Sequence, residues 1–427
     1  MERRRFVRLA AAGVTSATGL AAAGCRRDDT EHHEDALRVV LADYGDAQGS
    51  RDGRRYWENL VARFRRRHPE VPVDLSVHAW STIDRRVAEQ VAAGRPPDIA
   101  QVTTFGAHAE ADRLYDAGEV VPVAVQAAFV YPLARAGESR HLQYGLPFAA
   151  STRLFFYNRE LFARAGLDPD RPPRTWQGLR RAAEALRDAG VEVPYGLPLG
   201  RQEAQAEAMM WLLSNNGGYT DGSGGYALDA PANRVALDWL RGSLVRPGLT
   251  QPDPAKTDRA TLFEAFCQGR VGMLNGHPRL ARDAAARGVD YAVAPAPGRI
   301  GPATASLAVA DWVVAFRSRG RREQIRTFLT FLYDERTVRD FSDHYALLPV
   351  TTAGGEWMRR SRRHRRLWPF VEELPSAECP PVGKASWPSV SARIKARIGE
   401  AVTADGDPAT VLAELQQYAQ RADGAVA

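Results

Sequence analysis

Apolar and polar positions follow strand and helix periods in turn along the first hundred residues. An apolar, β-branched run from Leu37 to Ala42 predicts a strand. Residues 54–67 carry apolar side chains at helical spacing and arginines between them, which predicts an amphipathic helix. A second strand in 71–80, a helix over 83–93 and a third strand in GRPPDIAQV follow. This order indicates an α/β fold with a mostly parallel sheet flanked by helices.

Ligands of such sheets bind beyond the carboxyl ends of the strands. In this chain those positions are Asp43 and Tyr44 after the first strand, residues 78–81 after the second and residues 103–106 after the third. Asp43 and Tyr44 are therefore candidate binding residues. A solvated loop after the strand is the other interpretation of this pair.

A long apolar run from Leu146 to Tyr157 is interrupted by small and polar residues. We expect it to be a strand that passes between two lobes. Ser151, Thr152 and Arg153 then lie where the crossing faces a cleft. The run leads into a short helix and a proline-rich turn before Trp176.

The second half of the chain continues with helices and short strands. Helical spacing recurs in 176–190, 202–215, 232–246, 258–268 and in two segments after residue 320, while VGMLNG, YAVAPAPG and ASLAVADWVVAF predict strands. We expect crossings near 149–153, 306–314 and 347–351. They divide the chain into lobe 1, 37–149 plus 311–348, and lobe 2, 150–310 plus 349–427, joined by a multi-strand hinge that allows closure.

Length, composition and charge fit a two-lobed globular protein. The 427 residues exceed the roughly 250 to 300 at which single cores stop growing. The net charge is +6, but the first 24 residues hold four arginines, and the remainder has 53 basic and 50 acidic residues. This balance argues against nucleic acid as the main partner. Cys267 and Cys379 are either separate thiols or a bridge, and separate thiols are the preferred interpretation.

The amino terminus predicts export. RRRFVRLAAAGVTSATGLAAAGC has a basic head and an apolar stretch too short to span a bilayer, which is typical of a signal peptide over residues 1–24. Its arginine pair resembles the twin-arginine export motif, and AAGC resembles a lipobox that would make Cys25 the lipidated first residue of the mature chain. An ordinary cleaved signal is the alternative. Residues 25–36 form a linker, whose adjacent histidines are weak evidence for a metal site.

Several motifs in a fixed order resemble the extracellular solute-binding proteins of ABC importers, in the sugar-binding group. They are AAGRPPDIA, YGLPFAASTRLFFYNRELFARAGL with TW, NNGG at 215–218, VGMLNGHPRL, TFLYDERTVRDFSDHYALLPV and ASWPSVSARIKARIGEAV with DPATVLAELQQYA. The resemblance implies a two-lobed, periplasmic-binding-protein-like fold with the ligand cleft at the hinge. It implies an extracytoplasmic receptor, with no cofactor and no enzymatic activity, that delivers a sugar or oligosaccharide to permease subunits driven by a separate ATPase. A monomer, anchored to the outer face of the cell membrane through Cys25, is expected.

A sugar receptor needs aromatic planes and fixed polar groups in a concave site. Trp387 matches a sugar-stacking tryptophan of the family, and Trp80 and Trp312 follow or lie in predicted strands. Core packing is the alternative for each of them. Trp211 lies just before NNGG, near a ligand-contact helix of the family. The polar candidates are Ser151, Glu207, Asn275, His277 and Asp311. Where the family has a carboxylate this chain has Ser151, and His277 with Pro278 replace a proline and a tryptophan, so maltose itself is not expected.

Other functions have weaker support from the sequence. A receptor for a non-sugar solute, such as a polyamine or a glycerophosphodiester, stays open. An exported carbohydrate-active hydrolase would need a matched acid and nucleophile, and the neighbours Glu372 and Glu373 do not supply them. MRRSRRHRR at 358–366 indicates a solvated helix face or a surface that meets anionic lipid headgroups.

Overall fold

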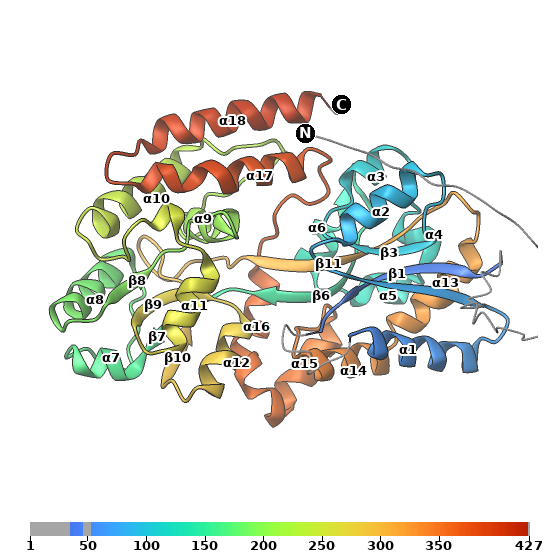
Figure 1. The fold of residues 1–427 in the computed structure, drawn as a ribbon, viewed down its shortest axis with the longest axis horizontal. Coiled ribbons are helices and arrows are strands. Elements are labelled where there is room, and N and C mark those ends of the chain that lie inside the picture. The colour runs from blue at the N-terminus through green and yellow to red at the C-terminus, as the bar shows by residue number, and fades with distance from the viewer. Residues whose placement is uncertain (1–34, 46–52, 426–427) are drawn as a thin grey trace, which may run out of the picture.

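Two β-sheets, each with its own helices, divide the molecule into two lobes (Figure 1). The structure is a computed structural model and describes residues 35–45 and 53–425. The predicted signal peptide, Cys25 and most of the predicted linker lie outside the described residues. Within the described part, every helix is too short or too polar to cross a membrane.

Lobe 1 is built on a five-stranded sheet with the order β2-β1-β3-β11-β6. Its strands are β1 (Leu37–Asp43), β2 (Val73–Ala79), β3 (Ile99–Val102), β6 (Leu146–Thr152) and β11 (Ala308–Ala315). The pairs β1/β2 and β1/β3 are parallel, as the sequence predicts. β11 pairs antiparallel with both β3 and β6, because it enters the sheet from the other lobe.

The helices of lobe 1 bury one apolar face each. In α1 the predicted amphipathic helix is confirmed, and Trp57 and Phe64 are fully buried. The indole Nε1 of Trp57 donates a hydrogen bond of 2.7 Å to the carbonyl oxygen of Ala42, which ties the helix to β1. The helices are α1 (Gly53–Arg67), α2 (Ile83–Ala92), α3 (Gly106–Glu110), α4 (Ala117–Val120), α5 (Val123–Ala128), α6 (Tyr131–Ala136), α13 (Arg322–Leu332) and α14 (Glu335–Tyr345).

Lobe 2 is built on a four-stranded sheet with the order β10-β7-β9-β8. Its strands are β7 (Leu154–Asn158), β8 (Val193–Gly196), β9 (Val271–Gly276) and β10 (Tyr291–Ala294). Only β8/β9 is a parallel pair, and β7 lies antiparallel between β9 and β10. The expected mostly parallel sheet is therefore mixed here, since β7 arrives directly from lobe 1 and runs against its neighbours.

The helices of lobe 2 surround this sheet. They are α7 (Arg159–Arg164), α8 (Trp176–Asp188), α9 (Ala204–Leu213), α10 (Pro231–Leu240), α11 (Arg259–Cys267), α12 (Pro278–Ala286), α17 (Trp387–Arg397) and α18 (Pro408–Gly424). The predicted helix over 232–246 continues after α10 as one π-helical turn, Arg241–Val245. Two further helices, α15 (Thr352–Arg360) and α16 (Trp368–Glu373), lie below β6 and β11 near the middle of Figure 1.

The crossing segments lie side by side. The predicted single strand from Leu146 to Tyr157 is two strands, because Arg153 separates β6 in one sheet from β7 in the other. The backbone of Leu348 bridges Ala150 on the outer side of β6, so this segment lies beside the first crossing, and a third crossing here stays a prediction. A further segment lies along the start of β11, where Glu378 bridges Leu307. The sequence analysis did not predict this contact.

Two other features of the sequence have a clear place. Cys267 and Cys379 are both free thiols, so the preferred interpretation is confirmed. The basic run lies at the end of α15 and in a 3-10 helix, Arg362–Leu367, with its six arginines exposed. His364 is buried within the run, and its Nε2 lies 2.7 Å from a carboxylate oxygen of Asp343. The run is thus a solvated surface, and contact with lipid headgroups stays a prediction.

One carboxylate lies inside lobe 2 and joins α9 to β9. Oε1 of Glu207 accepts hydrogen bonds of 3.0 Å from Nε1 of Trp211 and 3.0 Å from Nδ2 of Asn275. The residue is only 7% exposed. Burial raises the pKa of Glu207 to about 7, although the hydrogen bonds from Asn275 and Trp211 act to lower it.

This carboxylate makes stability depend on pH. Between the ordinary glutamate value of 4.5 and about 7, the native state holds a proton that the unfolded state has lost, so the free energy of unfolding falls as pH rises. Glu207→Gln keeps an acceptor for Trp211 and Asn275 but does not titrate. We expect the free energy of unfolding of the variant, relative to that of wild type, to increase by roughly 2 to 4 kcal/mol as the pH rises from 4.5 to 8. Urea denaturation at each pH measures this difference. Glu58→Gln, at an exposed position on α1, is the control. A Glu207→Gln profile parallel to wild type would contradict the prediction.

Candidate functional site

The carboxyl ends of the strands in both lobes face the same space. β11 enters lobe 1 at Ala308, and β3 pairs with it antiparallel, so β3 ends on the side of lobe 2, as do β1 and β2. In lobe 2, β7 starts at the crossing, and β9 ends opposite Leu154, on the side of lobe 1. β8 runs parallel to β9 and ends on the same side. The candidate cleft therefore lies between the two sheets, at the edges where α/β proteins bind ligands.

The paired crossing strands supply the floor of this cleft. In the register of β6 with β11, Ser151 lies opposite Val309, and Ala149 lies opposite Asp311. Because side chains alternate along strands, Ser151, Val309 and Asp311 share one face, and each of the three is at least partly exposed. Thr152 points to the other face, where it is fully buried and donates a hydrogen bond of 2.8 Å to the carbonyl of Phe370. Thr152 therefore does not face the cleft as the sequence analysis expected.

A β-bulge interrupts the register between Asp311 and Trp312. Pro147 pairs with Trp312 and Ala149 with Asp311, so Phe148 is the extra residue on β6. Asp311 and Trp312 are neighbours on β11, so their side chains point to opposite faces. Asp311 lies at the edge of the cleft, whereas Trp312 lies in the core of lobe 1. The ring of Trp312 packs 5.6 Å from that of Phe105, and the residue is 1% exposed. Trp312 presents no face to the cleft in this arrangement.

Tyr44 and Asp311 form the polar part of the lobe 1 wall. The hydroxyl of Tyr44 donates to Oδ2 of Asp311 at 2.8 Å and accepts from Nε2 of Gln101 at 3.1 Å. Burial raises the pKa of Asp311 to about 7, while the hydrogen bond from Tyr44 lowers it. Trp80 packs edge-on against Tyr44 at 5.3 Å between ring centroids and is partly exposed. Asp43 lies next to them, with Oδ1 accepting from the backbone N–H of Gly45 at 2.7 Å.

A charged cluster forms the lobe 2 wall. Arg153 follows β6 at the end of the crossing. Its Nη2 lies 3.6 Å from Oε2 of Glu203, and Nε of Arg259 lies 3.0 Å from the same oxygen. Arg259 also contacts Nε2 of His277, which caps α12 by accepting from the backbone N–H of Arg279. Burial lowers the pKa of His277 well below its ordinary value, and the neighbouring arginines lower it further. His277 is therefore neutral at ordinary pH.

The remaining predicted residues lie deeper. Asn275 and Glu207 are hydrogen-bonded to each other and border the charged cluster. Trp211 stacks on Trp239 at 5.7 Å in the interior of lobe 2, and its 3% exposure indicates a packing role in this arrangement. Trp387, at the start of α17, is 4% exposed and packs 5.6 Å from Tyr219. The structure thus brings Ser151, Asp311, Tyr44, Asp43 and Trp80 to the floor and one wall.

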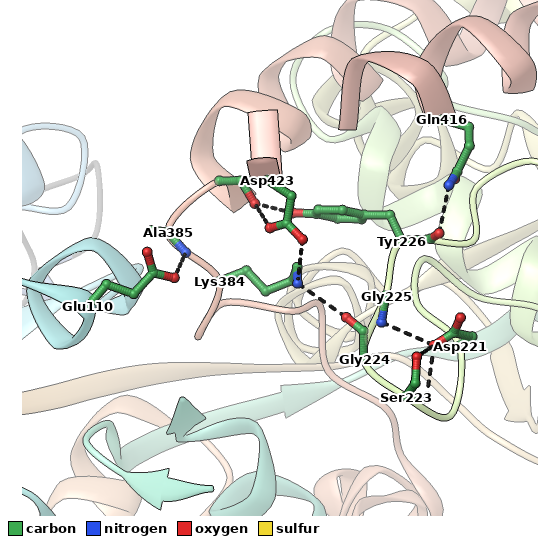
Figure 2. A network of polar contacts seen from close by, with 11 residues as sticks. Glu110, Asp221, Ser223, Gly224, Gly225, Tyr226, Lys384, Ala385, Gln416 and Asp423 are labelled. Atoms are coloured by element: carbon green, nitrogen blue, oxygen red, sulfur yellow. Dashed lines mark hydrogen bonds and ion pairs between the residues drawn. The ribbon is translucent and has the colours of Figure 1, made fainter. Parts of the chain in front are cut away.

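A hollow of about 1040 Å³ lies between the lobes. Residues from α6 and the segment after it line one side, the 216–224 loop lines the other, and the 377–384 segment runs along it. Figure 2 shows the polar contacts at its border. Nζ of Lys384 donates to the carbonyl of Gly224 at 3.2 Å and pairs with Oδ2 of Asp423 at 2.9 Å. These contacts fix the 384–386 segment to lobe 2.

The same segment touches lobe 1. The backbone N–H of Ala385 donates to Oε1 of Glu110 at 3.4 Å (Figure 2). A Cβ on Gly106 would come within 2.5 Å of the carbonyl carbon of Lys384, so only glycine fits at this point of α3. The lobes therefore meet closely along this seam.

Sequence reasoning missed two residues of the lobe 2 wall, Glu203 and Arg259. Both lie at the amino ends of helices, where charged residues are ordinary, and only the fold brings them to Arg153. Among the residues that the structure describes, no group of three or more His, Cys, Asp or Glu side chains is placed to hold a metal ion.

Comparison with known proteins identifies relatives of the whole two-lobed chain. A binding protein of Brucella abortus is 27% identical over 359 residues, 81% of this chain and 83% of the relative. The sn-glycerol-3-phosphate-binding periplasmic protein of Pectobacterium atrosepticum is 24% identical over 342 residues, 75% of this chain and 74% of that protein. The crystal structure of the cyclic α-maltosyl-1,6-maltose binding protein from Arthrobacter globiformis superimposes with a TM-score of 0.75 at 20% identity, covering 91% of this chain and 99% of that one.

These relatives are binding proteins, and the crystal structure shows that the two-lobed fold is shared. The model of one family matches residues 48–338. The chain belongs to the bacterial extracellular solute-binding protein family.

Proposed function

We propose that this protein is the receptor of an ABC importer and binds a sugar or oligosaccharide between its two lobes. The observation that carries the proposal is the meeting of strand ends from both sheets across the paired crossing strands. Tyr44 and Trp80 offer aromatic surface there, and Ser151 and Asp311 offer hydrogen-bonding groups. Apolar ring faces and hydroxyl groups of a sugar need this combination. Family membership supports an extracytoplasmic location.

Closure of the lobes transmits the binding event. A ligand that touches both walls favours the closed arrangement, because it gains contacts there that the open one lacks. The closed surface is then recognised by permease subunits, and a separate ATPase drives transport. The receptor acts as a monomer and carries out no chemistry. This role fits the relatives, which are named as binding proteins.

A phosphate-containing or other non-sugar solute is the second candidate. The similarity to the sn-glycerol-3-phosphate-binding protein of Pectobacterium atrosepticum favours it. A polyamine fits less well, because Arg153 and Arg259 would repel a cation at the lobe 2 wall. An exported hydrolase is the remaining alternative. A hydrolase would cleave its ligand, whereas a receptor releases it unchanged.

We further propose that the protein is a lipoprotein exported by the twin-arginine route. The support is the sequence of residues 1–25, which precedes the described residues. Thioether-linked lipid on Cys25 would hold the receptor at the outer face of the membrane, close to its permease.

Titration with a panel of sugars and oligosaccharides tests the receptor function. We expect one class to change the tryptophan fluorescence, to lower the radius of gyration in X-ray scattering, and to be recovered uncleaved. Trp80→Ala should weaken binding by about 5- to 100-fold, because a stacked aromatic surface contributes roughly 1 to 3 kcal/mol. Val123→Ala, at an exposed position of α5, is the control and should bind as wild type does. Cleavage of the ligand, or no binding by any member, would refute the proposal.

Metabolic labelling with a fatty-acid analogue tests the anchor. Wild type should incorporate the label, and Cys25→Ala should not, because the lipobox cysteine provides the thiol that is modified. Cys379→Ala, which removes another free thiol, should be labelled as strongly as wild type. Equal labelling of the Cys25→Ala variant would exclude lipidation at this residue.

A further inference from the structure

The charged wall of lobe 2 encloses a small hollow next to the floor of the cleft. Nine residues line it: Arg153, Pro198, Glu203, Ala206, Glu207, Met210, Arg259, Phe263 and Asn275. The side chains of Glu203 and Arg259 are 29% and 22% exposed, while the Arg153 side chain is 9% exposed. A buried cation and a partly exposed one therefore lie together in this wall.

Positive charge exceeds negative charge around this hollow. Arg153 and Arg259 share one carboxylate, Glu203, at 3.6 and 3.0 Å. The other acid in the lining is Glu207, whose pKa burial raises to about 7, so it carries at most part of a charge at ordinary pH. Neutral His277 adds none. Two guanidinium groups thus face little more than one negative charge.

The surroundings do not supply the missing anion. Beyond His277, Arg279 and Arg282 lie close enough to act on its pKa in the same direction as Arg153 and Arg259. Those two arginines also share one acid, Asp283, at 3.3 and 3.0 Å. The cationic excess is therefore repeated in the next layer rather than cancelled there.

Further contacts hold the two arginines in position. Nε of Arg259 pairs with Oε2 of Glu203 at 3.0 Å. The Arg259 guanidinium lies over the ring of Phe263, 5.2 Å from its centroid. Arg153 donates from Nη1 to Oγ of Ser151 at 3.2 Å, so the cluster is continuous with the cleft floor.

We infer that Arg153 and Arg259, beside this hollow, form a subsite for one anionic group of the ligand, a phosphate or a carboxylate. Guanidinium groups bind both anions in a fork-like, two-bond geometry. The rest of the ligand lies over Ser151 toward Trp80 and Tyr44. The inference rests on the proposed receptor function and narrows its substrate class to acidic sugars or polyol phosphates.

An ordinary network of ion pairs is the competing explanation. Such a network would pair each guanidinium with its own carboxylate. Here Arg153 and Arg259 share the carboxylate of Glu203. The other acid, Glu207, accepts hydrogen bonds from Trp211 and Asn275 instead, and this arrangement favours a binding role.

Matched neutral and acidic ligands separate the two explanations. Calorimetric titrations compare glucose with glucose 6-phosphate and glucuronate, and glycerol with sn-glycerol 3-phosphate; inorganic phosphate serves as the minimal probe. We expect at least one acidic member to bind at least about tenfold more tightly than its neutral partner. Arg153→Gln and Arg259→Gln should remove this preference, while Arg259→Lys should keep part of it. Arg180→Gln, an exposed ion-pair residue on α8, should leave it unchanged.

The outcomes distinguish this inference from the function on which it rests. Two outcomes overturn the subsite and leave the receptor function standing. In one, the wild type binds a neutral ligand more tightly than its acidic partner. In the other, the arginine variants lose affinity for neutral and acidic ligands equally. No binding by any ligand, in this series or among neutral oligosaccharides, overturns both. Thermal melting by circular dichroism checks folding. If Arg153→Gln does not fold, the test rests on Arg259→Lys and Arg259→Gln. For each of them, the affinity for the acidic ligand is compared with the affinity for its neutral partner.

Discussion

The antiparallel pairing of β6 with β11 is the contact on which the rest of the molecule depends. Both strands belong to the sheet of lobe 1 and connect directly to strands of lobe 2, β7 and β10, and their register sets which residues face the cleft. Ser151 and Asp311 lie on the open face, where Val309 and Ala149 are their respective partners. The opposite face is buried, and it packs on α16. One ladder of backbone hydrogen bonds therefore positions the floor and orients both walls.

Burial acts unequally on the acids and bases of the cleft. It raises the pKa of Asp311 and Glu207 to about 7, where carboxyl groups are half protonated at ordinary pH. It also lowers the pKa of the Arg153 guanidinium, but the ordinary value for arginine is so high that this group stays charged. The same desolvation thus weakens negative charge and preserves positive charge. A site built from both residue types becomes cationic without any excess of arginine in its composition.

The sequence predicts the fold better than the site. Local periodicity is sufficient for α1 and β1, since Trp57 and Phe64 repeat at helical spacing and are buried. The crossing at Arg153 is recognisable because small and polar residues interrupt an apolar run. By contrast, Glu203 and Arg259 are far apart in sequence, and no local pattern brings them together. A tryptophan within a strand carries no signal that separates stacking on a ligand from burial in the core, as Trp312 shows.

The bulge at Phe148 also fixes the facing of the two halves of β6. Five residues separate Leu146 from Ser151, whereas their partners on β11, Val313 and Val309, are only four apart. An odd separation would place Leu146 and Ser151 on opposite faces of a regular strand, and the extra residue keeps them on one face. A change that drew Phe148 into the ladder would therefore turn one half of β6 over, and either Leu146 or Ser151 would move to the opposite face.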